Sequence, residues 1–255
     1  MSWRYFLYRR LAPWVTFEAR LWDEKRLSLR SKHEADSFSD VFCDPFYWRA
    51  FDLVEPAPTL VVDCGANCGH FTLLVEKCIR ARQGDSQTKY LLIEPNPLLG
   101  RTLARNLSDA GISDRCEVKR NLLGQRTGTG TLWVHDRSFL AAGLTRMPGA
   151  RPFQIEYLDL PKAIGERQID LMKIDIEGGE FDLVRSSLEI FTRVRTLFME
   201  LHDADGALHL ELLTSLSRAG LRPAMPLRKA HGHQLAIFQS RDVPKLAGAQ
   251  QGVEP

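Results

Sequence analysis

Apolar and polar positions along this chain form blocks that predict alternating buried strands and helices. The runs at 60–63, 90–94 and 169–175 are short, rich in Val, Ile and Leu, and end in acidic or turn residues. Such runs are typical of parallel strands buried on both faces. Longer segments separated by Gly, Ser and Asp turns lie between them. This alternation predicts an α/β fold with a doubly wound, mostly parallel sheet and helices on both faces.

The elements expected along the chain fall into three parts of unequal length. Residues 1–58 form a lead-in segment with a helical cap, 59–242 form the main domain, and 243–255 form a disordered tail. Residues 138–152 are expected to be a mobile loop. The expected strands are 60–63, 90–94, 116–120, 169–175, 195–201 and 234–239, with an extended segment at 153–157. The expected helices are 69–82, 98–110, 160–165, 179–190 and 207–219.

A glycine-containing turn follows the first of these strands and is a candidate binding feature. Asp63 ends the strand, and Gly65 and Gly69 flank the turn before the next helix. Glycine has no Cβ, so the backbone can approach a ligand closely there. The Gly-x-x-x-Gly spacing differs from the Gly-x-Gly-x-x-Gly of dinucleotide sites. An acid beside it favours S-adenosylmethionine, whose methionine end is cationic and which needs no phosphate site. Similar turns also occur in loops that bind nothing.

A second acid follows the next predicted strand. Glu94 ends the run 90–93 and precedes Pro95-Asn96-Pro97. In a doubly wound sheet this strand lies beside the first, so the carboxylate could accept the hydroxyls of a ribose. Glu94 could equally cap the helix expected near Leu98, because acids favour helix N-termini. The two roles are compatible.

Charged side chains gather at the ends of two further strands. Lys173, Asp175 and Glu177 share one face if the strand stays extended, and Glu200 and His202 share a face of the next strand. Three charges on a buried strand are costly unless they serve a site. Neighbouring strands lie roughly 4.8 Å apart, so we expect the two groups within side-chain reach of each other.

Composition and charge narrow the class of protein. The 255 residues are 44% hydrophobic and 26% charged, with a net charge of +2, too mild to indicate a nucleic-acid partner. The five cysteines have no metal-ligand spacing and predict a reduced, cytoplasmic protein. No apolar stretch reaches the ~20 residues that span a bilayer. Residues 1–22 interleave aromatic residues with arginines, which fits a cap packed on the core, or peripheral contact with an anionic membrane.

Four motifs in order give the chain a family resemblance. VVDCGANCG, IEPNP with Asn106 further along, KIDIEGGE and MELH span residues 61–203. Together they resemble the FkbM family of S-adenosylmethionine-dependent methyltransferases, which methylate oxygen, often on sugars or polyketide-type metabolites. The resemblance implies a Rossmann-like class I methyltransferase fold. The first 36 residues lie outside it, so it assigns no contacts to the acceptor.

The resemblance also implies roles for individual residues. Glu94 would hold the ribose, Asn121 would lie near the adenine, and Asp175 would lie beside the sulfonium and the reacting methyl group. Four residues of the glycine turn would hold the methionine moiety: Asp63, Gly65, Asn67 and Gly69.

The reaction needs an acceptor oxygen aligned with the methyl group and relieved of its proton. His202 is the preferred base, because imidazole titrates near neutrality. Glu200 could orient it, and Lys173 could restrain the carboxylates or polarise the acceptor. Glu177 and Glu180 could instead bond backbone amides where the next helix begins.

Several alternatives stay open at this point. Asp175, Glu177, Glu200 and His202 are ligand types that magnesium or manganese accept, but a bound metal is not favoured, because Lys173 could neutralise the acids. An RNA ribose methyltransferase, a nicotinamide-dependent dehydrogenase and a non-catalytic cofactor-binding module compete with the O-methyltransferase. The acceptor, a small or glycosylated molecule, cannot be identified from the chain, and neither can the oligomeric state.

Overall fold

The computed structural model describes residues 16–55, 57–135, 138–202, 206–226, 228–230 and 233–242. Its centre is a large sheet in the order β11-β13-β10-β9-β3-β4-β5, with β12 paired to β13. The five strands from β10 to β5 pair in parallel, and β13 runs antiparallel to β10. The strands are β3 (Leu60–Cys64), β4 (Lys89–Ile93), β5 (Cys116–Lys119), β9 (Ile169–Ile174), β10 (Val194–Leu201), β11 (Leu221–Pro223), β12 (Arg228–Ala230) and β13 (His233–Ser240). The predicted α/β fold with a mostly parallel sheet is confirmed.

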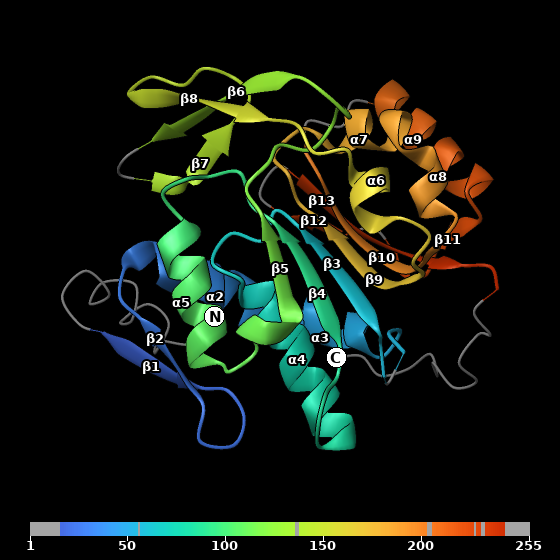
Figure 1. The fold of residues 1–255 in the computed structure, drawn as a ribbon. Helices are drawn as coiled ribbons and strands as arrows, with labels where there is room; N and C mark the ends of the chain where they lie inside the picture. Colours follow the sequence, from blue (N-terminus) through green and yellow to red (C-terminus); the bar gives the residue numbers. More distant parts are fainter. Residues whose placement is uncertain are drawn as a thin grey trace.

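Helices cover both faces of this sheet (Figure 1). One face packs against α3 (Pro45–Phe51) and α4 (His70–Gln83), and its core includes Val61 and Leu171. On this side lie also α2 (Lys32–Phe42), which packs on α4, and α5 (Gly100–Asp109), followed by the short η1 (Ser113–Arg115). The other face packs against α6 (Leu160–Ile164), α7 (Glu180–Ser186), α8 (Leu188–Phe191) and α9 (Gly206–Arg218), with Val62 and Met172 in its core. Successive side chains of β3 and β9 therefore point to opposite faces of the sheet and pack into two separate cores.

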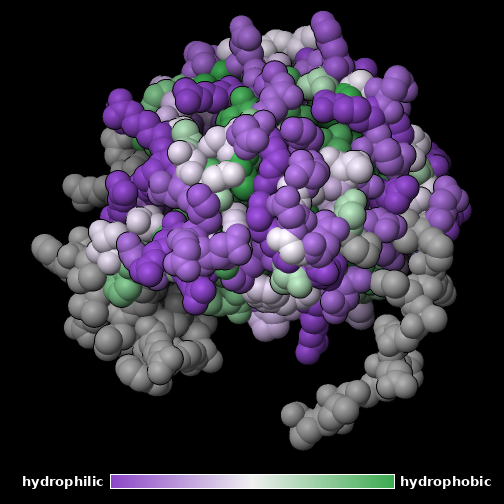
Figure 2. All heavy atoms as spheres, turned by 60° about the horizontal axis from the view of Figure 1, so that its bottom comes forward, coloured by the Kyte–Doolittle hydropathy of each residue, from purple (hydrophilic) through white to green (hydrophobic). Residues whose placement is uncertain are grey.

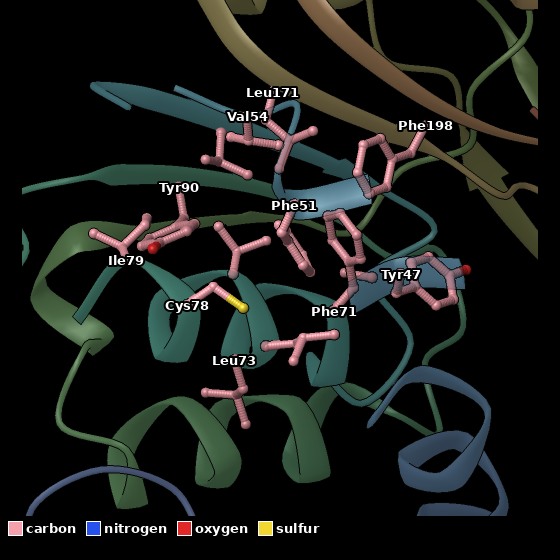
Figure 3. Packing of buried hydrophobic residues seen from close by; sticks show 14 of the residues in the cluster. Tyr47, Phe51, Val54, Phe71, Leu73, Cys78, Ile79, Tyr90, Leu171 and Phe198 are labelled. Carbon is pink, nitrogen blue, oxygen red and sulfur yellow. The ribbon is translucent and has the colours of Figure 1, made fainter. Parts of the chain in front are cut away.

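An aromatic cluster ties the lead-in segment to the sheet. Tyr47 and Phe51 of α3 pack against Phe71 of α4 and Phe198 of β10, with ring centroids 5.7–6.3 Å apart. Figure 3 shows the Tyr47 hydroxyl pointing away from the other rings. The cluster buries Tyr47 and Phe51 of α3 against the large sheet, whereas Trp48 of the same helix is exposed.

Residues 138–152 do not form the expected loop. They contribute to a second, antiparallel sheet in the order β7-β6-β8, made of β6 (Thr129–His135), β7 (Ser138–Gly143) and β8 (Ala150–Glu156). The Gly and Pro residues of this stretch read locally as turns, but pairing with β6 supplies the backbone hydrogen bonds that make strands. The helix expected at 179–190 is likewise divided, at Ser187, into α7 and α8.

The described part of the aromatic N-terminus is not helical. Phe17–Arg20 (β1) and Arg26–Leu29 (β2) form an antiparallel hairpin. Burial alternates along both strands, the period of a half-buried sheet rather than a helix. The helical cap begins later, at Lys32 of α2. Trp22 and Leu21 are buried in the core, as expected for a packed cap. Residues 1–15 and the expected tail lie outside the described residues.

The surface in Figure 2 is mainly hydrophilic, with small separate hydrophobic patches. None of the helices that the structure describes combines the length and the apolar character needed to cross a bilayer.

Candidate active site

The glycine turn after β3 packs directly against the end of β9. Gly65, Asn67 and Gly69 have positive φ angles of 82°, 50° and 82°. A Cβ on Gly65 would lie 1.7 Å from the backbone carbonyl oxygen of Asp175, so no other residue fits there without separating the two strand ends. The backbone amides of Gly65 and Ala66 both donate to the carbonyl of Ile93, which joins the turn to β4 as well.

Asp63 is buried inside the protein and does not line the pocket that is described below. Its side chain is fully buried, and its Oδ2 accepts a hydrogen bond from Thr72 Oγ1 at 2.8 Å. Burial raises the pKa of Asp63, although the nearby Lys173 partly offsets this. Asp63 and Gly69 do not line the pocket described below, so their predicted contact with the methionine moiety gives way to a supporting position.

Lys173 connects Asp63, the glycine turn and Asp175. Its Nζ donates to the carbonyl oxygen of Gly65 at 2.6 Å, and lies 3.1 Å from Asp175 Oδ2 and 3.7 Å from Asp63 Oδ1. Burial opposes its charge, but the two carboxylates outweigh burial and raise its pKa. Because three oxygens surround the ammonium, the structure favours restraint of the carboxylates over polarisation of an acceptor.

Glu94 bridges the turns that follow β3 and β4. Its Oε2 accepts from the backbone amide of Asn67 at 2.7 Å and its Oε1 from that of Asn96 at 2.8 Å. Burial raises the pKa of Glu94 to about 7, although the two amides favour the charged form. Glu94 does not cap Leu98, because that amide donates to the side chain of Asn96. Instead the carboxylate faces a pocket.

This pocket lies between the tips of the large sheet and the small sheet; its cavity volume is about 80 Å³, and it opens to solvent. Five predicted cofactor residues line it: Gly65, Asn67, Glu94, Asn121 and Asp175. Asn121 also donates to the carbonyl of Glu156. Apolar side chains also line it, among them Ile93, Leu99, Leu122, Leu123, Leu132 and Leu144. A polar edge with apolar walls suits a nucleoside whose base is flat and whose sugar and tail are polar.

Sequence reasoning missed two contributors to this site. His33 of α2 places its Nε2 3.0 Å from Asn67 Oδ1, and burial lowers its pKa, so it is a neutral partner for the amide. Asn96, between two prolines, lines the pocket. No local pattern marks His33, whereas the Pro-Asn-Pro run could have drawn attention to Asn96.

Charged residues at the ends of β9 and β10 meet beside the pocket, which Asp175 lines. One ligand atom each from Asp175, Glu200 and His202 lie within 4.8 Å of one another. His202 Nε2 is 3.4 Å from Glu200 Oε1 and 3.5 Å from Glu177 Oε2, and Nδ1 is 3.0 Å from Glu180 Oε1. The sequence therefore placed both groups correctly relative to each other, although Glu177 has φ 55°, so extension does not persist that far.

The surroundings of His202 do not favour its predicted role as base. Burial opposes a charged imidazole, but bonds to Glu180 and Glu200 and the charge of Glu177 outweigh burial and raise the pKa of His202 to about 11. An imidazole that already holds both protons at neutral pH has no free nitrogen to accept another. Glu180 is fully buried and accepts from the amides of Ile176 and Gly178, so it bonds the backbone as the sequence suggested.

Glu177 differs from its neighbours in being exposed at the pocket edge. Its side chain lines the pocket, and 51% of it is accessible. Partial burial, followed by the charge of Asp175, raises its pKa to about 7. It bonds none of the backbone amides that Glu180 engages. The oxygens and imidazole of this cluster could accept a divalent cation, but His202 already lies between carboxylates, so metal binding stays an unfavoured expectation.

A comparison of the sequence with known protein families identifies the family of this chain. Residues 63–223 match the family described as the methyltransferase FkbM domain. The chain belongs to the FkbM methyltransferase family. This FkbM protein is also 25% identical over 191 residues to "Methyltransferase 1" of Beauveria bassiana (strain ARSEF 2860), covering 66% of this chain and 73% of that protein.

Two solved methyltransferases are similar to this FkbM protein. Methyltransferase FkbM from Methylobacillus flagellatus KT is 18% identical, with 92% of this chain and 59% of that chain covered and a TM-score of 0.49. The ribosomal protein L11 methylase of Lactobacillus delbrueckii subsp. bulgaricus is 10% identical, with 76% of each chain covered and a TM-score of 0.46.

The pocket fits the cofactor of this family. The Gly65 backbone and the Glu94 carboxylate line its polar side, where hydroxyl groups of a ribose could be accepted, and several leucines line the rest. The FkbM protein is accordingly an S-adenosylmethionine-dependent methyltransferase.

Proposed function

We propose that this FkbM protein transfers a methyl group to a hydroxyl oxygen of a small molecule, such as a sugar or a polyketide-type metabolite. The observation that carries the proposal is a group of carboxylates: Asp175 and Glu177 line the pocket, and Glu200 places an oxygen within 4.8 Å of an Asp175 oxygen. Carboxylate oxygens accept hydrogen bonds and can take a proton, which suits an acceptor that presents hydroxyl groups.

We assign different residues of the chain to binding the cofactor and to positioning the reacting groups. Asn67 would hold the methionine end, Glu94 the ribose and the leucine walls the adenine. When bound, S-adenosylmethionine supplies an electrophilic methyl group, which the acceptor oxygen takes as the carbon–sulfur bond breaks. Lys173 keeps Asp175 beside Gly65, so the floor of the site is rigid before any ligand arrives.

Glu177 is the residue that we assign as proton acceptor. It lines the pocket, as Asp175 does. With a pKa of about 7, a large fraction of its carboxylate is ionised at neutral pH and can accept a proton. As the oxygen–methyl bond forms, the hydroxyl proton passes to the Glu177 carboxylate. The His202 imidazolium, 3.5 Å from Glu177, balances the negative charge of the cluster and keeps the carboxylate in place.

Labelling with a heavy methyl group tests the proposal. Purified protein and methyl-deuterated S-adenosylmethionine are incubated with a metabolite extract, and mass spectrometry identifies products that gain three deuteriums. We expect the label on oxygen of a small molecule, and fragmentation to locate it. Label found on nitrogen, carbon or RNA ribose would refute the proposal. Because Lys173 and His202 supply the cations of this cluster, we also expect activity to survive exhaustive chelation with EDTA.

A further inference from the structure

We propose that Asn96 is a cofactor-binding residue whose side-chain amide nitrogen donates a hydrogen bond to a ribose oxygen of the adenosyl group. Asn96 and Glu94 would then hold the diol from both sides, one as donor and the other as acceptor. The inference rests on the pocket being the S-adenosylmethionine site and names a contact that neither the fold nor the family assignment supplies.

The orientation of the Asn96 side chain is set by the protein. Its Oδ1 accepts from the backbone amide of Leu98 at 3.0 Å, and its own backbone amide donates to Glu94 Oε1 at 2.8 Å. The first bond turns the side-chain oxygen towards the start of α5, and the second ties the backbone of Asn96 to Glu94. The nitrogen therefore faces away from Leu98, and Asn96 lines the pocket.

The nitrogen that remains is buried and lacks a partner. Asn96 is 2% exposed, and among the residues that the structure describes no atom accepts a hydrogen bond from Nδ2. Leaving a buried donor unpaired is unfavourable, so such groups are rare in native proteins unless a ligand or water completes them. Asn121, another amide of the pocket, already donates to the carbonyl of Glu156, so it does not show the same deficit.

The position of Glu94 selects the ribose as the partner. A ribose hydroxyl is both donor and acceptor, and a carboxylate satisfies only its donor side. Asn96 lies two residues after Glu94, and its backbone amide donates to the Glu94 carboxylate. We therefore infer that its Nδ2 donates to the same ribose hydroxyls whose protons Glu94 accepts. The apolar walls at Leu122, Leu132 and Leu144 leave the base to van der Waals contact.

Calorimetry with S-adenosylhomocysteine tests the contact without needing turnover. The variant Asn96→Ser keeps an oxygen for the Leu98 amide and removes the nitrogen, and Asn96→Asp keeps the shape and replaces the nitrogen by oxygen. We expect both to bind S-adenosylhomocysteine about tenfold or more weakly than the wild type, which corresponds to one lost hydrogen bond. Unchanged affinity in both variants would overturn the proposal.

Ligand analogues identify the atom on the other side of the bond. The 2′-deoxy and 3′-deoxy forms of S-adenosylhomocysteine each lack one ribose oxygen, and the 3-deaza form lacks a ring nitrogen of adenine. For one deoxy form, wild type and Asn96→Ser should bind with nearly equal affinity, because the bond is already gone. A loss that disappears only with the 3-deaza form would refute the ribose assignment.

Two controls separate this inference from its premises. Thermal melting of Asn96→Ser should stay within a few degrees of the wild type, because the serine hydroxyl also accepts from a backbone amide two residues on and adds no charge beside Glu94. A wild-type protein that does not bind S-adenosylhomocysteine would contradict the cofactor assignment itself. Failure of the Asn96 contact would instead leave the wild-type affinity intact.

Discussion

The close packing of Gly65 against the backbone of Asp175 can be tested by mutation. Gly65 packs so tightly on the Asp175 carbonyl that an added Cβ would lie at 1.7 Å, whereas real Cβ contacts essentially never fall below 3.0 Å. For Gly65→Ala the two backbones must therefore separate by roughly 1.3 Å. That movement would break the bond from the Asp175 amide to the Cys64 carbonyl and the bond from Lys173 to the Gly65 carbonyl.

The cost can be estimated by comparison with a glycine that has no neighbour. Gly84 ends α4 with the same φ of 82°, and a Cβ added there would meet nothing within 4 Å. Gly84→Ala thus carries only backbone strain, about 1–3 kcal/mol. Gly65→Ala adds two broken buried hydrogen bonds at about 1–3 kcal/mol each. The sum approaches the whole stability of a typical domain, about 5–15 kcal/mol.

Thermal unfolding and calorimetry measure the difference. We expect Gly84→Ala to melt less than about 10 °C below the wild type and to bind S-adenosylhomocysteine normally. Gly65→Ala should melt at least about 6 °C below the wild type and clearly below Gly84→Ala, or fail to fold, and any folded fraction should bind the ligand poorly. Equal melting temperatures for the two variants, with normal binding in both, would refute the close packing of the turn on β9.

Three further predictions concern the charges of the site. Lys173→Met leaves the carboxylates of Asp63 and Asp175 without their cation and should lower the free energy of unfolding by about 3–5 kcal/mol in urea titrations, whereas a loss below about 1 kcal/mol would contradict the pairing. Because only ionised Glu94 accepts from both ribose hydroxyls and its pKa is about 7, affinity for S-adenosylhomocysteine should fall about tenfold from pH 8 to pH 6, and Glu94→Gln should remove that dependence. Glu177→Gln should lower kcat/KM about 100-fold and abolish its rise with pH through about 7, while a retained rise would exclude Glu177 as the base.

Much of the fold followed from local patterns in the chain. The buried strands, the glycine turn and the charged strand tips could all be predicted, because each depends on residues close in sequence. A strand buried on both faces must be apolar along nearly its whole length, as β3 is. The antiparallel hairpin at Phe17–Leu29 was not predicted. The interleaved aromatic residues and arginines of this region suggested a helical cap, although buried and exposed positions alternate along both strands.

The small sheet shows why other parts could not be predicted. Strands β7 and β8 lie in a stretch with Gly and Pro, and their backbone groups are satisfied by β6 rather than by neighbours in sequence. The wall that Ala142, Gly143 and Leu144 add to the pocket exists only through that pairing.

The chain by itself determined that acids would stand at the tips of parallel strands around a glycine turn. The tertiary structure decided which of them face the pocket: Asp63 is buried away from it, while Glu94 and Asp175 line it. It also brought Glu177, Glu180 and Glu200 around His202, and these groups raise the pKa of its imidazole. A side chain's charge and free hydrogen-bonding atoms depend on groups about 3 Å away in space, and those groups come from segments that only folding brings together.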